Sequence, residues 1–221
     1  MQAAGPAVVW AIVVAAGSGS RFGGPKQYER LGDSRVLDWS VRSARSVATG
    51  VVLAVGADDA GRSEPDVDLV VAGGASRSAS VRAALAVVPE RASVIVVHDA
   101  ARPLASPALF AAVVDAVEAG AEAAVPGVAL ADTVKRVAGG RVVATLERAA
   151  LVAVQTPQAF DAAALRQAHA TGGSATDDAA LVEATGGVVV VVPGEVRNLK
   201  VTTRDDLEQL RRWVAEAEVR P

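Results

Sequence analysis

The chain has 221 residues, a length typical of one α/β domain, and a formal net charge of −3. It has no cysteine, which excludes disulfides, thiolate metal sites and a cysteine nucleophile. The small negative charge offers no overall attraction for nucleic acid or a membrane surface, and neither is expected as a partner. No apolar run approaches the roughly 18 residues of a membrane span, and residues 1–6 lack the basic start of a signal peptide, so we expect a cytoplasmic protein.

Strand-like and helix-like segments alternate along the first half of the chain. Apolar runs predict strands over 8–14, 51–55, 69–71 and 94–97, and helical spacing predicts helices over 36–47, 76–88 and 107–119. This alternation predicts an α/β fold with one doubly wound, mostly parallel sheet, whose ligands bind at the carboxyl ends of the strands. We see no linker or internal repeat, so residues 1–221 are expected to form a single domain.

The segment after the first strand has the composition of a phosphate-binding loop. Gly17 and Gly19 leave backbone N–H groups open to an anion, and Arg21 and Lys26 add positive charge. Two better-known types of phosphate-binding loop do not match this segment. Phe22 stands where a dinucleotide-binding loop has its third glycine, and no serine or threonine follows Lys26 as in a P-loop. An ordinary glycine-rich connection between a strand and a helix remains the alternative.

Two further motifs stand at strand ends. The turn at 73–81 opens a helix, where a serine is commonly an N-cap, but the glycines also allow backbone groups to meet the edge of a base. Asp99 follows a fully apolar strand and is placed to hold a divalent cation such as Mg²⁺, directly or through water, unless it caps the next helix. Arg102 is either a surface cation or a ligand for a second substrate. His98 is expected in the core, and His169, in a polar helix, is given no role.

The pattern changes to that of a β-hairpin between residues 129 and 152. Alternating segments at 132–137 and 141–145 flank a Gly-Gly turn. A two-stranded ribbon is marginally stable by itself, so this β-arm needs a cover, either its own domain or a second copy of the chain.

The last third predicts three local features. Thr176 is expected to be an N-cap, with Asp177 and Asp178 in the first turn of a helix. Residues 188–192 are expected to form a buried strand. Lys200 is expected within an apolar strand, where its ammonium is costly unless it meets an anion, although a solvated edge position is the alternative.

These motifs resemble the signature of sugar-nucleotide pyrophosphorylases, and more narrowly that of the cytidylyltransferases acting on 2-C-methyl-D-erythritol 4-phosphate. The resemblance covers about residues 8–210. It is carried by the segments 15–28, 73–81, 98–103, 128–155 and 198–202, which stand in the family's order. The chain departs from the family pattern at Val14, where many relatives have proline, and at Ala75, where an acidic residue is common.

The resemblance implies that an acceptor phosphate attacks the α-phosphorus of CTP and pyrophosphate leaves, with Mg²⁺ as cofactor. The implied catalytic cations are Arg21, Lys26 and Lys200. The implied CTP-binding residues are Ala15, Ala16, Gly17, Gly19, Arg21, Lys26, Gly74, Ala75, Ser80 and Ala100. The implied acceptor-binding residues are Asp99, Arg102, Thr133, Arg148, Thr156 and Lys200. In the resembled family the 129–152 arm forms a homodimer, and Thr133 and Arg148 act across its interface.

Three other functions remain open. The nearest is a cytidylyltransferase for another polyol phosphate, such as ribitol 5-phosphate. A nucleotide-sugar-dependent glycosyltransferase would need a pair of carboxylates after a strand, whereas Asp99 stands alone. The third is a nucleotide-binding module without catalytic activity.

Overall fold

The structure is a computed structural model that describes residues 7–218, so the segment 1–6 considered above lies outside the described residues. The strands of its main sheet are β1 Val9–Val14, β4 Gly50–Val55, β5 Leu69–Ala72, β6 Val94–Asp99, β7 Ala123–Ala129, β10 Val152–Val154, β11 Gln158–Asp161 and β12 Val189–Pro193. Their order is β10-β7-β11-β6-β1-β4-β5, with β12 paired to β7. Strands β10 and β11 are antiparallel to their neighbours and the other pairs are parallel. The prediction of a mostly parallel sheet is therefore confirmed.

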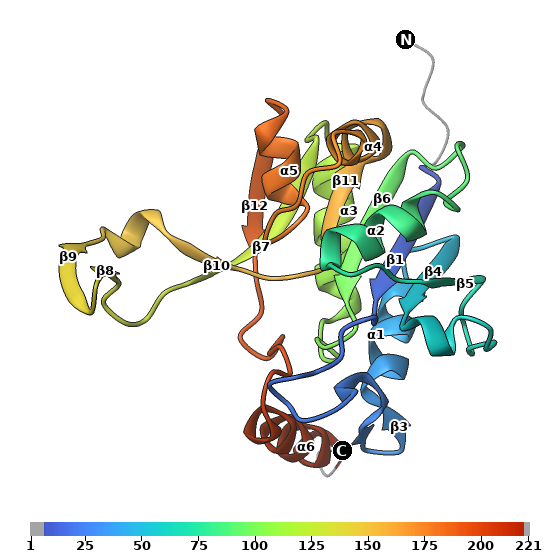
Figure 1. The fold of residues 1–221 in the computed structure, drawn as a ribbon, viewed down its shortest axis with the longest axis horizontal. Coiled ribbons are helices and arrows are strands. Elements are labelled where there is room, and N and C mark those ends of the chain that lie inside the picture. The colour runs from blue at the N-terminus through green and yellow to red at the C-terminus, as the bar shows by residue number, and fades with distance from the viewer. Residues whose placement is uncertain (1–6, 219–221) are drawn as a thin grey trace.

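Helices cover both faces of this sheet (Figure 1). They are α1 Val36–Arg45, α2 Arg77–Leu85, α3 Pro107–Glu118, α4 Ala162–Ala170, α5 Ala179–Ala184 and α6 Arg204–Glu218. Successive side chains of a strand point to opposite faces, so Ala11 and Val13 of β1 pack in the cluster that contains α1 and α3, whereas Ile12 packs with α2 and α4. Helix α6 belongs to a smaller third cluster, in which Leu207 and Phe22 are buried. No helix within residues 7–218 is long and apolar enough to cross a membrane.

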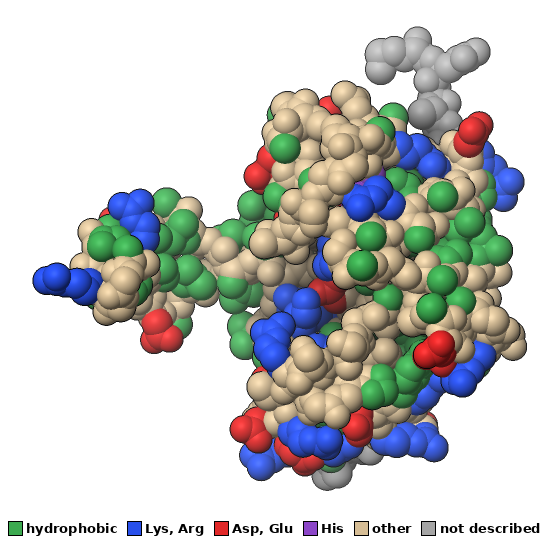
Figure 2. Space-filling view, in the orientation of Figure 1, with side chains coloured by type: hydrophobic (Ala, Val, Ile, Leu, Met, Phe, Trp, Pro, Cys, Tyr) green, Lys and Arg blue, Asp and Glu red, His purple; other side chains and the backbone are tan. Residues whose placement is uncertain are grey.

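The predicted hairpin is a separate two-stranded sheet that projects from the body of the molecule (Figure 1). Its strands are β8 Lys135–Ala138 and β9 Arg141–Thr145. Apolar side chains are visible along this arm in Figure 2, and Val137 and Val142 are 55% and 62% exposed. The arm therefore presents an apolar surface that its own domain does not cover.

Two of the three local predictions for the last third of the chain are wrong at the level of the fold, and the third, on Lys200, is corrected with the site below. The strand at 188–192 is not buried, because β12 is an edge strand whose Val191 is 55% exposed. Thr176 is not an N-cap, because α5 begins at Ala179. The carboxylate of Asp177 instead accepts a hydrogen bond from the backbone N–H of Ala180, at 3.0 Å.

Candidate active site

The shape of the loop after β1 depends on one glycine and one buried amide. Gly19 has a φ of +68°, and its carbonyl accepts the N–H of Phe22 at 2.9 Å. A Cβ atom at Gly19 would lie 1.8 Å from the carbonyl oxygen of Gly24, so no other residue fits here without moving the loop. The side chain of Gln27 donates to the carbonyl of Ala15 at 2.9 Å. The loop is thus folded back on itself and tied to the end of β1.

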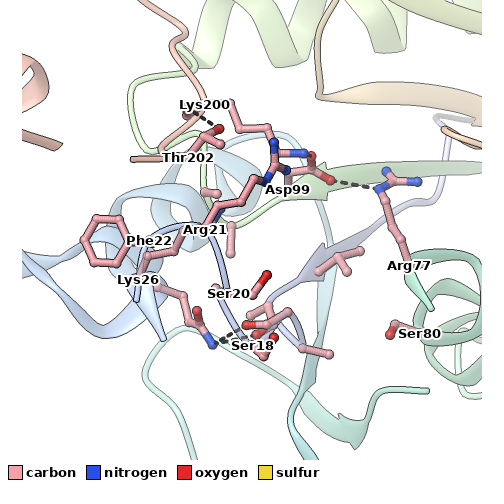
Figure 3. A pocket seen from close by; sticks show the side chains of 18 of the residues that line it. Ser18, Ser20, Arg21, Phe22, Lys26, Arg77, Ser80, Asp99, Lys200 and Thr202 are labelled. Atoms are coloured by element: carbon pink, nitrogen blue, oxygen red, sulfur yellow. Dashed lines mark hydrogen bonds and ion pairs between the residues drawn. The ribbon is translucent and has the colours of Figure 1, made fainter. Parts of the chain in front are cut away.

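This loop forms one wall of a cavity of about 510 Å³ at the carboxyl ends of β1 and β6 (Figure 3). The turn before α2 and the loop before α6 form further walls. The predicted site residues that line the cavity are Ala15, Ala16, Gly17, Gly19, Arg21, Lys26, Gly74, Ala75, Ser80, Asp99, Ala100 and Lys200. The cavity therefore joins residues from segments far apart in the sequence.

A second cavity, of about 260 Å³, contains the predicted acceptor residues Arg102 and Thr156. Three side chains line both cavities: Arg77, Asp99 and Lys200. We call these three side chains the shared wall. A group bound in either cavity would meet the same charges there.

Two predicted acceptor residues, Thr133 and Arg148, lie on the arm. Both are exposed, and within the described chain they line neither cavity. Arg148 donates a hydrogen bond to the backbone carbonyl of Ala131, which belongs to the same arm. A single copy of the chain therefore does not bring them to the other acceptor residues.

The cations of the first cavity perturb one another. The Asp99 carboxylate accepts from Arg77 Nε at 3.0 Å and from Lys200 Nζ at 2.6 Å (Figure 3). Burial alone would raise the pKa of Asp99, but the charges of Arg77 and Lys200 lower it below its ordinary value. Burial lowers the pKa of Lys26, and the nearby charges of Lys200 and Arg21 lower it further. The cavity thus concentrates positive charge, which favours an anionic ligand.

Lys200 does not lie within a strand, contrary to the sequence prediction, because residues 194–203 form a loop. The backbone N–H of Val201 donates to the carbonyl of Ala101 at 2.8 Å. The buried Asn198 side chain donates to the carbonyl of Thr156 at 2.9 Å. These contacts fix the loop on both sides of Lys200 and leave its side chain 40% exposed at the shared wall.

His98 is fully buried beneath the site, as the sequence predicts. Its Nε2 lies 3.2 Å from the carbonyl oxygen of Arg102, and its Nδ1 lies 3.2 Å from the hydroxyl of Thr156. That hydroxyl accepts the backbone N–H of Asp99 at 3.0 Å. Burial lowers the pKa of His98 to about 4, so the ring is neutral near pH 7 and holds the end of β6 in place.

Three residues beside the site are not predicted from the sequence: Arg77, Asp178 and His169. Arg77 Nη1 lies 2.6 Å from Asp178, and His169 Nε2 lies 2.9 Å from the other oxygen of the same carboxylate. The sequence contains one signal that Arg77 has an anionic partner. Arg77 is the first residue of α2, where the helix dipole disfavours a cation unless an anion compensates for it.

The carboxylates near the cavity determine whether a divalent cation fits the site. Within residues 7–218 no cluster of three metal-ligating side chains is found. Asp99 lines the first cavity, but both of its oxygens already accept hydrogen bonds from cations. Mg²⁺ commonly takes one carboxylate and fills its other positions with water and substrate phosphates. These residues therefore fit an ion that arrives with a phosphate ligand, not one held by the protein alone.

This fold and this cation-lined cavity define an α/β nucleotidyltransferase. The family described as 2-C-methyl-D-erythritol 4-phosphate cytidylyltransferase (IspD) matches residues 9–216, and the chain belongs to that family. A cytidylyltransferase of this name from Streptomyces coelicolor is 46% identical over 224 residues, which cover 91% of this chain and 83% of the relative.

Two more relatives give the same assignment. The crystal structure of the enzyme of this name from Thermus thermophilus superposes with a TM-score of 0.79 at 33% identity, and covers 92% of this chain and 98% of that one. A bifunctional IspD/IspF enzyme from Solidesulfovibrio magneticus is 40% identical over 225 residues, which cover 91% of this chain. The chain spans only 56% of the length of that relative.

Proposed function

We propose that this protein transfers CMP from CTP to 2-C-methyl-D-erythritol 4-phosphate and releases pyrophosphate, a step of isoprenoid precursor synthesis by the methylerythritol phosphate pathway. The observation that carries the proposal is that Arg21, Lys26 and Lys200, from distant segments, line one cavity beside Asp99. Membership of the cytidylyltransferase family supports the choice of nucleotide and acceptor.

The chemistry needs little beyond positioning and positive charge. An acceptor phosphate monoester is largely ionised near neutral pH, so it attacks the α-phosphorus of CTP without a general base, in line with the departing pyrophosphate. Arg21, Lys26 and Lys200 neutralise the charge that develops on the phosphate oxygens. The shared wall is where the acceptor phosphate of the second cavity and the α-phosphate of the first would meet.

The turn before α2 is proposed to select cytosine. Ser80 Oγ accepts the N–H of Gly74 at 3.1 Å and donates to the carbonyl of Ser76 at 3.0 Å, so the serine fixes the turn. The backbone of Gly74 and Ala75 would then meet the base. Ala75 has no acidic side chain, so backbone groups would have to recognise the cytosine base.

The acceptor site is proposed to be completed by a second copy of the chain. Arg102 and Thr156 line the second cavity, whereas Thr133 and Arg148 lie on the exposed 129–152 arm. A homodimer in which each arm reaches the partner would cover the apolar arm surface and bring the two exposed residues to the acceptor phosphate. The remaining residues 1–128 and 153–221 would then form the body of one cytidylyltransferase domain.

Mg²⁺ is proposed to arrive with CTP, because Asp99 is the one carboxylate among the described residues that lines the first cavity. When bound, the ion supplies charge neutralisation at the phosphates. A cytoplasmic location belongs to the same proposal, because CTP is supplied there.

The test is an assay of pyrophosphate release by the purified chain. CTP is compared with ATP, GTP and UTP, and 2-C-methyl-D-erythritol 4-phosphate with ribitol 5-phosphate, each with Mg²⁺ and with EDTA. We expect release only with CTP, the methylerythritol phosphate and the metal. Faster turnover of ribitol 5-phosphate would replace the proposed acceptor, and CTP binding without any product would contradict catalysis.

A further inference from the structure

A line of four charged side chains of alternating sign, ending on the imidazole of His169, runs from the shared wall into the core. It passes from Lys200 to Asp99 (2.6 Å), to Arg77 (3.0 Å), to Asp178 (2.6 Å) and to His169 (2.9 Å). The side chains of Lys200, Asp99 and Arg77 are 40%, 10% and 22% exposed, whereas those of Asp178 and His169 are 0% and 2% exposed. The inner two residues, Asp178 and His169, line neither cavity, and the proposed chemistry does not use them.

Burial of the Asp178 carboxylate carries a large desolvation cost. Its oxygens are taken by Arg77 and His169, and a fully buried carboxylate is tolerated only with such partners. A buried ion pair is often no more stabilising than apolar residues of similar size. Stability alone therefore does not account for Asp178, and a role in fixing the geometry of Arg77 does.

Arg77 is held by two carboxylates. Its Nε donates to Asp99 and its Nη1 to Asp178, whereas Nη2 is buried without a hydrogen-bond partner in the described part of the chain. Removal of the Asp178 contact would leave this guanidinium attached through Asp99 alone. The orientation of Asp99 at the shared wall thus depends on a residue buried behind it.

Lys200 differs from Arg77 in how it is held. Its side chain is 40% exposed, and its ammonium ends a flexible stem and pairs with Asp99, so a phosphate at the shared wall would compete for it. If Lys200 turns to that phosphate, Asp99 keeps Arg77 as its partner, because Arg77 is anchored from behind.

Building on the proposed cytidylyl transfer, we propose that Asp178 and His169 are positioning residues. They anchor Arg77, so that Asp99 keeps its orientation and charge while Lys200 engages the reacting phosphate. Asp178 acts through Arg77, and His169 acts through Asp178.

The first test is the steady-state kinetics of Asp178→Asn, which keeps the size of the side chain and removes its charge. We expect kcat to fall by about 10- to 100-fold, as when a group that supports a functional residue is removed, with a much smaller change in the KM for CTP. The matched control is Leu165→Ala, a fully buried residue of α4 outside the line of charges, which destabilises the same region. An equal loss of kcat in this control would assign the effect to stability and overturn the proposal.

A double-mutant comparison tests whether Asp178 acts through Arg77. We expect the double mutant Arg77→Gln/Asp178→Asn to be no slower than the single mutant Arg77→Gln, because Asp178 has no guanidinium to position once Arg77 is replaced. Multiplying defects would overturn the proposal. If Asp178→Asn does not fold, His169→Gln, which keeps a donor, and His169→Leu, which does not, replace it. The first should retain most of kcat and the second should lose it, and equal rates would contradict the role of His169.

These outcomes are distinct from failure of the proposed function. A wild-type chain without cytidylyl transfer would overturn both proposals. An active wild type with an unimpaired Asp178→Asn variant would overturn this one alone, as would a crystal structure of that variant in which Arg77 and Asp99 keep the orientations they have in the wild type.

Discussion

The ammonium of Lys200 lies 2.6 Å from the carboxylate of Asp99, although the two residues are 101 positions apart in the sequence. The pair stands where two cavities adjoin. A phosphate that enters either cavity must compete with Asp99 for this cation. Under the proposed function, the binding of a substrate phosphate would therefore be coupled to this one ion pair.

Replacement of either lysine of the first cavity should remove catalysis and keep the fold. For Lys26→Ala and Lys200→Ala we expect kcat to fall by about 10²–10³-fold, by analogy with the loss of one oxyanion donor. Pyrophosphate release measures the rate, and circular dichroism with thermal melting checks the fold. A near-normal rate in either variant would remove that lysine from the mechanism.

The pH dependence should report the charge of Lys26. Its pKa is lowered by burial and by Lys200 and Arg21, so the alkaline fall in kcat/KM for CTP is expected below pH 10.5. Lys26→Arg keeps its charge at that pH, and its alkaline limb should move upward. An unchanged limb in Lys26→Arg would show that another group titrates there.

The glycine at position 19 should be required for the binding of CTP. In Gly19→Ala a Cβ atom would collide with the Gly24 carbonyl, and a left-handed backbone costs a residue with a side chain about 1–2 kcal/mol. We expect CTP affinity, measured by calorimetry, to fall at least about tenfold. Gly24→Ala is the matched control, because its Cβ would meet nothing within 4 Å. Equal affinities in the two variants would contradict the role given to the loop.

The exchange of arms between copies can be tested by mixing two impaired enzymes. Arg148→Ala damages the arm and Lys200→Ala damages the body, so a mixed dimer would contain one intact site. Random exchange should restore about a quarter of wild-type activity. If mixing restores nothing while mass spectrometry shows mixed dimers, Arg148 does not act across the interface.

The stability of the fold should fall in mild acid because of His98. Its folded pKa of about 4 lies below the unfolded value of roughly 6.5, so between these values the unfolded chain binds a proton that the folded chain does not. Stability is therefore full above pH 6.5 and is lost as the pH falls, by about 2 kcal/mol between pH 7 and 5. Urea unfolding at both pH values measures this loss, which should be smaller in His98→Gln. The same slope in the variant would assign the loss to other groups.

The sequence predicts those parts of the site that depend on local chemistry. Runs of β-branched residues mark β1 and β6, and parallel strands end at one edge, so Arg21 and Asp99 were expected close together. The structure places both in one cavity. The arm was predictable for a similar reason, because the Gly-Gly turn and the alternation beside it are local signals.

The parts that were not predicted depend on tertiary packing. His169 stands among alanines and polar residues, and its pairing with Asp178 arises only when α4 and α5 pack together. Leu199 and Val201 gave the Lys200 segment the pattern of a strand, yet they pack against the α6 cluster from a loop. The valines of β12 suggested burial on both sides, and only the strand order reveals an edge.

The shared wall has a consequence for inhibitors. A molecule that joins cytidine to a polyol through a non-hydrolysable diphosphate mimic would span both hollows, about 510 and 260 Å³, and place its charged centre between Arg77 and Lys200. Neutral compounds would leave Lys200 and Arg77 with only the protein's own carboxylates, Asp99 and Asp178, as counter-ions. Medicinal chemistry on this enzyme therefore faces a trade between charge, which the site demands, and passage through cell membranes.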